Sequence, residues 1–208
     1  MYWYINFIIL FMFASLIGCA SNTELDSSPQ KAVDHVDAPF AQSAIIIDIS
    51  TDTDLNSLNG IANSCTILVI QAQKIATLNK LLSNPFELKS IFGSGGAQNE
   101  ILKVDRYSAM PGQRTTLHID RSQNTHYIAF VAGYYPFPKK QHMAIFAIPV
   151  TTKETGSWHS KWSAQLSSLK LRLRLGSDSI SQLEGAKQVP VTYTDNNMTA
   201  EKGDYDVS

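Results

Sequence analysis

The sequence Leu169-Lys-Leu-Arg-Leu-Arg-Leu175 alternates strictly between leucine and a basic residue. Since successive side chains of a β-strand point to opposite faces, the four leucines share one face and the three cations share the other. This is the strongest two-residue alternation in the chain, and it is typical of a strand with one face in the core and one in water. It predicts an all-β fold in which these cations lie on a solvated strand face.

Similar but shorter strand patterns occur along the rest of the chain. Ile45, Ile47 and Ile49 share one face of residues 44–49, and residues 126–135 are apolar on both faces, as in a central strand. The predicted strands are residues 44–49, 66–72, 100–107, 115–120, 126–135, 142–150 and 169–175, with a further candidate at 189–193. Short strands separated by turn signals at near-regular spacing predict a two-sheet β-sandwich.

Two short helices are expected between the second and third strands. Apolar residues recur at helical spacing at Ile75, Leu78, Leu81 and Leu82. Asn84-Pro-Phe-Glu87 then supplies an N-cap, a proline in the first turn and a capping-box glutamate. We expect this helical insert to cover an end or an edge of the sandwich.

The N-terminus has the features of an export signal. Its apolar core, residues 7–17, has signal-peptide length and is too short to span a bilayer. The following Leu16-Ile17-Gly18-Cys19 resembles the lipobox of bacterial lipoproteins. The resemblance implies cleavage between Gly18 and Cys19, lipid on Cys19 and, because Ala20 follows, passage to the outer membrane. The alternative is an uncleaved N-terminal membrane helix.

These signals divide the chain into four parts. We expect a signal peptide at residues 1–18, a lipidated cysteine with a flexible tether at 19–43, a β-sandwich domain at 44–176 and a partly disordered extension at 177–208. The tether is polar and has no apolar periodicity. A coil of about 24 residues reaches roughly 25–30 Å, which would hold the domain clear of the lipid headgroups.

Composition and motifs give no positive evidence for catalysis. The net charge of −1 and the scattered basic residues argue against nucleic-acid binding. The five histidines match no metal-binding spacing, although His118 and His126 would face each other if their strands formed a hairpin. No nucleophile-elbow, P-loop or dinucleotide-binding pattern occurs. We therefore predict no enzyme activity, catalytic residue, metal, cofactor or small-molecule substrate.

Two local features leave alternatives open. If Cys19 is lipidated, Cys65 has no partner in the chain, and its strand-like surroundings favour burial over a reactive thiol. The aromatic residues Tyr134, Tyr135 and Phe137 lie at the end of the predicted strand 126–135. They are interpreted either as a strand end or as a platform for a sugar or peptide, which would make the chain a periplasmic ligand-binding lipoprotein.

The order of the features resembles one family over roughly residues 44–175. After the lipobox and tether come a strand, a long polar loop, Cys65-Thr-Ile-Leu-Val-Ile-Gln-Ala72, the helical insert, Pro111-Gly112 and Tyr127-Ile-Ala-Phe-Val-Ala-Gly-Tyr-Tyr135. This order is similar to that of the TssJ (VasD-type) lipoproteins of bacterial type VI secretion systems. The resemblance implies a transthyretin-like β-sandwich, anchored in the outer membrane and facing the periplasm. Its implied partner is the periplasmic domain of TssM, within the TssJ–TssL–TssM complex.

In that family the loop between the first two strands contacts TssM, and by position it falls on residues 52–63 here. Leu55, Leu58 and Ile61 are apolar residues in this polar loop, so they either form part of an interface or fix the loop onto the sandwich. The expected partner-binding residues are Asp52, Asp54, Leu55, Asn56, Leu58, Asn59, Ile61 and Asn63.

Overall fold

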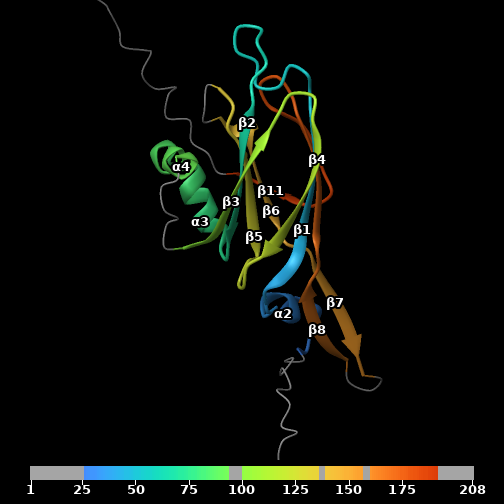
Figure 1. Cartoon of the computed structure of the whole chain (residues 1–208). Helices are drawn as coiled ribbons and strands as arrows, with labels where there is room; N and C mark the ends of the chain where they lie inside the picture. Colours follow the sequence, from blue (N-terminus) through green and yellow to red (C-terminus); the bar gives the residue numbers. More distant parts are fainter. Residues whose placement is uncertain (1–25, 94–99, 136–138, 157–159, 192–208) are drawn as a thin grey trace, which may run out of the picture.

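The computed structural model of the chain describes residues 26–93, 100–135, 139–156 and 160–191. Two β-sheets pack face to face, and two helices lie outside one of them (Figure 1). The helices are α2 (Pro29–Asp34), α3 (Ile75–Leu82) and α4 (Pro85–Phe92), with a 3-10 turn at Lys140–His142. The strands are β1 (Ala41–Thr51), β2 (Cys65–Ala72), β3 (Ile101–Ala109), β4 (Arg114–Arg121), β5 (Tyr127–Ala132), β6 (Met143–Ala147), β7 (Val150–Thr155), β8 (Lys161–Leu166), β9 (Leu169–Leu175), β10 (Ile180–Glu184) and β11 (Gln188–Val189).

The two sheets confirm the predicted all-β sandwich. One has the strand order β10-β9-β1-β4 and the other β11-β6-β5-β2-β3, while β7 and β8 form a separate hairpin. Three isoleucines of β1 (Ile45, Ile47 and Ile49) and the leucines of β9 point inward and pack with apolar residues of β2, β5 and β6. Lys170, Arg172 and Arg174 are exposed on the opposite face of β9, as their alternation predicts.

The two helices of the insert are confirmed, but their expected position is wrong, because α3 and α4 cover the outer face of the five-stranded sheet and not an end or an edge of the sandwich (Figure 1). The Asn84 side chain accepts hydrogen bonds from the backbone N–H groups of Phe86 and Glu87 and so caps α4. The Arg106 side chain of β3 donates to the Ile91 carbonyl oxygen at 3.0 Å, which fastens α4 to the sheet edge.

The predicted flexible tether is wrong from Asp26 onward. Residues 29–34 form α2, which packs on the β7–β8 hairpin, and Asp26 makes an antiparallel bridge with Trp162. Strand β1 also begins earlier than predicted, at Ala41. A helix of six residues has too few turns to show apolar periodicity, and its stability comes from packing that the local sequence does not reveal.

Two further boundaries differ from the prediction. The strand expected at 142–150 is divided into β6 and β7, with Pro149 between them, and β7 pairs with β8, which the sequence did not reveal. The sandwich also extends beyond Gly176, because β10 pairs with β9 and β11 pairs with β6. The rest of the predicted C-terminal extension, from residue 192, lies outside the described residues.

Some predicted features cannot be placed. The signal peptide, Gly18, Cys19 and Phe137 lie outside the described residues. In the part of the chain that the structure describes, no helix has the length and apolar character needed to span a membrane.

Substitutions on the two faces of β9 should have very different effects on stability. Replacing Leu171, which is buried between the sheets, with alanine should lower the free energy of unfolding by about 2–5 kcal/mol, because it leaves a cavity. The matched substitution Lys170→Ala on the exposed face should change it by less than about 0.5 kcal/mol. Equilibrium unfolding in urea measures both. Equal effects would contradict the assignment of the two faces.

Candidate partner-binding loop

The loop that joins β1 to β2 lies at one end of the sandwich, beside the β9–β10 loop and the β3–β4 turn (Figure 1). Backbone hydrogen bonds join these segments. The N–H of Asp52 donates to the Leu175 carbonyl at 2.9 Å, and the N–H of Ser57 donates to that of Ser177 at 2.8 Å. On the other side, the N–H of Gly112 donates to the Asp52 carbonyl at 3.0 Å. The first half of the loop is therefore held on both sides.

Side chains fasten the base of the loop further. Leu55 is 0% exposed and belongs to the core between the sheets. The Asp52 carboxylate accepts a hydrogen bond from Arg174 Nε at 2.7 Å, so this strand cation has a structural partner. Asn56 Nδ2 donates to the Ser64 carbonyl at 2.8 Å, and its Oδ1 accepts from the N–H of Tyr135 at 3.1 Å. Together these contacts fix where the loop leaves the domain.

The tip of the loop is a tight two-residue turn. The backbone N–H groups of Leu58 and Ile61 donate to each other's carbonyl oxygens at 2.9 and 3.0 Å. Between them, Asn59 and Gly60 have φ angles of 53° and 79°, the left-handed conformation that a type I′ turn requires. Leu58 is 43% exposed and Ile61 68% exposed. Two branched aliphatic side chains are thus presented to solvent on a turn with a defined backbone.

The three apolar residues of the loop therefore have two different roles, since one fixes the loop onto the sandwich and two are available to form an interface. Leu55 fixes the loop onto the sandwich, whereas Leu58 and Ile61 are available for contact. Of the polar residues, Asn63 is used inside the loop, where its Nδ2 donates to the carbonyls of Ile61 and Asn56, and the Asn56 side chain is used in the bonds that fix the loop base. Asp54 and Asn59 are exposed.

A buried polar pair supports this end of the sandwich from beneath. The Tyr134 hydroxyl contacts the carbonyl oxygens of Ser179 at 2.9 Å and Gly176 at 3.2 Å. His142 Nε2 lies 2.8 Å from the Asp178 carbonyl oxygen, and the rings of Tyr134 and His142 are 4.8 Å apart. The pair holds the β9–β10 loop, against which the base of the β1–β2 loop is bonded.

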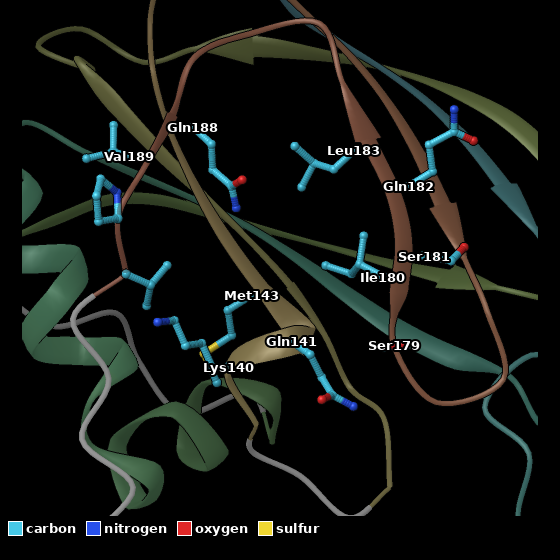
Figure 2. A pocket seen from close by; sticks show the side chains of 12 residues that line it. Lys140, Gln141, Met143, Ser179, Ile180, Ser181, Gln182, Leu183, Gln188 and Val189 are labelled. Atoms are coloured by element: carbon cyan, nitrogen blue, oxygen red, sulfur yellow. The ribbon is translucent and has the colours of Figure 1, made fainter.

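This arrangement removes Tyr134 from the aromatic ligand platform considered in the sequence. Tyr134 is 1% exposed and points into the core, whereas Tyr135 is exposed to solvent. A hollow of about 800 Å³ does lie nearby, between β10 and the β6–β11 edge (Figure 2). Figure 2 shows Ile180 and Leu183 of β10 directed into it, with Met143 and Gln188 on other sides. None of the described residues that line it is aromatic.

The structure also does not bring together the two-histidine site considered from the sequence. His118 and His126 do not face each other across a hairpin, because β4 pairs with β1 while β5 pairs with β2 and β6 in the other sheet. Within the described ranges, no group of three or more histidine, cysteine or acidic side chains is placed to hold a metal ion. Cys65 is buried, as predicted, and burial raises the pKa of its thiol to about 12, so it is a poor nucleophile.

Comparison with known families identifies the chain. Residues 43–178 match the model of the type VI secretion lipoproteins VasD, EvfM and TssJ. The chain belongs to this family. The matched region begins in β1 and ends after β9, so it covers most of the two-sheet sandwich of this type VI secretion lipoprotein. Strands β10 and β11 follow the matched region.

Several solved structures are similar to this type VI secretion lipoprotein. TssJ1 from Pseudomonas aeruginosa is 18% identical, with a TM-score of 0.49 over 74% of this chain and 99% of that chain. Lip from Serratia marcescens, a membrane-bound component of the type VI secretion system, is 17% identical, with a TM-score of 0.49 over 69% and 96%. A C-terminal domain of TssM from EAEC is 11% identical, with a TM-score of 0.46 over 71% and 98%. No curated protein sequence matches the chain.

The free energy of unfolding should depend on pH through His142. Burial lowers the pKa of His142, so the unfolded chain binds a proton that the folded chain excludes. The free energy of unfolding should therefore fall as the pH drops below about 6.5, the ordinary pKa of histidine. His142→Gln should reduce this dependence in urea unfolding between pH 7.5 and 5, and His118→Gln on the exposed face of β4 should leave it unchanged. An unaltered slope in His142→Gln would contradict the assignment.

Proposed function

We propose that this type VI secretion lipoprotein is lipidated on Cys19, is anchored in the outer membrane facing the periplasm, and binds the periplasmic domain of TssM through the tip of its β1–β2 loop. It would act as a structural component of the TssJ–TssL–TssM membrane complex and not as an enzyme. Membership of the family supports the assignment to the secretion system. The observation behind the choice of surface is the exposure of Leu58 and Ile61 on the tight turn.

The direction of the chain through the domain suits a protein that is anchored at one end and binds its partner at the other. The described chain begins at Asp26, next to β8, and enters β1 at Ala41. Strand β1 has 11 residues, which at about 3.3 Å per residue spans roughly 36 Å, and it ends where the loop begins. The end of the domain at which α2 lies is thus opposite the end that carries the β1–β2 loop (Figure 1).

The form of the loop tip also suits protein recognition. Buried aliphatic anchors at the centre of an interface provide much of its binding energy. Because the turn is closed by two backbone hydrogen bonds and its base is fixed by Leu55, little conformational freedom remains to be lost on binding. The same side chains on a structureless loop would bind less tightly.

The double substitution Leu58→Asp and Ile61→Asp should abolish binding of TssM. The substitution places two charges where the proposed interface is apolar. If each substituted side chain contributes about 2 kcal/mol or more to the binding free energy, the affinity should fall at least 100-fold. Co-purification with the periplasmic domain of TssM measures the effect. The control is Phe86→Asp, which alters an apolar side chain that is 86% exposed on α4.

Both variants should keep the circular dichroism spectrum and the melting temperature of the parent protein, because all three side chains are exposed. Retained TssM binding by the double variant, or equal loss in Phe86→Asp, would refute the loop as the contact surface.

Cys19 should be the site of lipidation. Cells that express the chain should incorporate a palmitate analogue into it, and Cys19→Ser should abolish the label. Without lipid, the chain should leave the outer-membrane fraction, since each buried methylene of an acyl chain contributes about 0.8 kcal/mol to anchoring. Absence of label on the unsubstituted chain would rule out the proposed anchor.

A further inference from the structure

Arg121, the last residue of β4, is a buried cation that has no carboxylate partner among the described residues. Its residue is 3% exposed, and its Nη2 donates to the Pro39 carbonyl oxygen at 3.2 Å. The Nε atom is buried and has no acceptor, and no carboxylate of the described residues forms an ion pair with the guanidinium. Burial lowers the pKa of Arg121. Buried arginines are normally paired with an anion, so this one lacks its usual partner.

Arg121 lines a groove of about 930 Å³, a volume in the range of small-ligand sites. The groove lies between the segment that follows α2, the β4–β5 loop and the end of β8. Gln123, Asn124 and Gln165 add neutral side-chain donors to its lining. The carboxylates that line it are Asp26, whose Oδ2 lies 3.4 Å from His35 Nδ1, and Asp37, which is exposed.

The walls of the groove are fixed before any ligand arrives. The N–H of Asn124 donates to the Ala38 carbonyl at 2.7 Å, which joins the β4–β5 loop to the N-terminal segment. Behind this loop, the buried Gln71 accepts hydrogen bonds from the N–H of Ser122 at 2.8 Å and the hydroxyl of Thr125 at 2.9 Å. A buried cation in a preformed groove is the usual arrangement of an anion site.

We propose that this groove binds a phosphate group, with Arg121 as its charged ligand and the neighbouring amides as neutral donors. The guanidinium presents several N–H donors in a planar fork that fits phosphate oxygens, and a hydrogen bond between charged groups is stronger than one between neutral groups. A phosphate would neutralise the charge that the described part of the chain leaves unpaired.

A phospholipid headgroup is the nearest source of that phosphate, and this choice rests on the lipidation of Cys19 proposed above. Six residues separate Cys19 from Asp26, and even a fully extended chain covers at most about 25 Å between them. Asp26 itself lines the groove. An acylated Cys19 would therefore keep the groove close to the headgroups of the membrane.

The test uses the mature, lipidated full-length chain in a detergent that contains no phosphate. It is titrated separately with dihexanoyl phosphatidylethanolamine and with inorganic phosphate, while the amide resonances of Gln123 and Asn124 and the Nε–H resonance of Arg121 are recorded by NMR. Saturable shifts are expected, and the midpoint should rise at least tenfold in Arg121→Gln. If the lipid saturates at a lower concentration than inorganic phosphate, the headgroup is the source. Equal midpoints would overturn the lipid assignment.

A second variant tests the site even if Arg121→Gln fails to fold. Gln123→Glu adds a negative charge to the groove at an exposed position and should weaken phosphate binding, whereas the matched Gln188→Glu on β11 should not. The proposal is overturned if neither probe gives a saturable shift, or if Gln123→Glu binds like Gln188→Glu. If palmitate labelling fails but Arg121-dependent binding persists, the proposed anchor is wrong and the phosphate site stands.

Discussion

The parallel pairing of β1 with β9 is the constraint on which the rest of the structure depends. The two strands are far apart in sequence and pair from Ile45 with Leu169 to Thr51 with Leu175. Their inward isoleucines and leucines form much of one wall of the core. A shift of register by one residue would put these side chains into water and the cations of β9 into the core, so the hydrophobic effect strongly specifies the pairing.

The same pairing determines where the candidate interface lies. Because parallel strands end at the same edge, the loops that follow Thr51 and Leu175 leave the sheet side by side. They then bond to each other through the N–H groups of Asp52 and Ser57, and Arg174 on the outer face of β9 reaches the Asp52 carboxylate. The rigidity of the loop base is therefore a consequence of sheet topology, and the loop retains exposed apolar residues only at its tip.

Local signals in the sequence were sufficient for much of the fold. The alternation of β9, the isoleucines of β1, the spacing of α3 and the Asn84 cap of α4 each depend on residues within a few positions of one another. The failures depend on contacts between distant segments. Nothing near Asp26 indicates its bridge to Trp162, and nothing near His118 indicates that β4 and β5 lie in different sheets.

For the candidate site, too, the local features were predictable and those that depend on distant contacts were not. The sequence identified the loop and its three apolar residues, but their different roles arise in three dimensions. Leu55 is covered by the core, whereas the backbone turn at Asn59 and Gly60 holds Leu58 and Ile61 away from it. The unpaired charge of Arg121 was also invisible, because a cation at a strand end normally remains in water. It is buried here because the N-terminal segment folds over it and Pro39 accepts its hydrogen bond.

Folding of the N-terminal segment also changes how a lipid-anchored domain would span the periplasm. With 24 free residues, the loop tip would sample a wide volume beneath the membrane. Six residues separate Cys19 from Asp26, so even a fully extended chain covers at most about 25 Å between them, whereas the β1 strand spans roughly 36 Å. Under the proposed anchoring, Leu58 and Ile61 would therefore be confined to a narrower range of depths than a free tether of 24 residues would allow. Binding to a partner that reaches across from the inner membrane would then cost the anchored domain less positional entropy, since the position of its loop tip is already restricted.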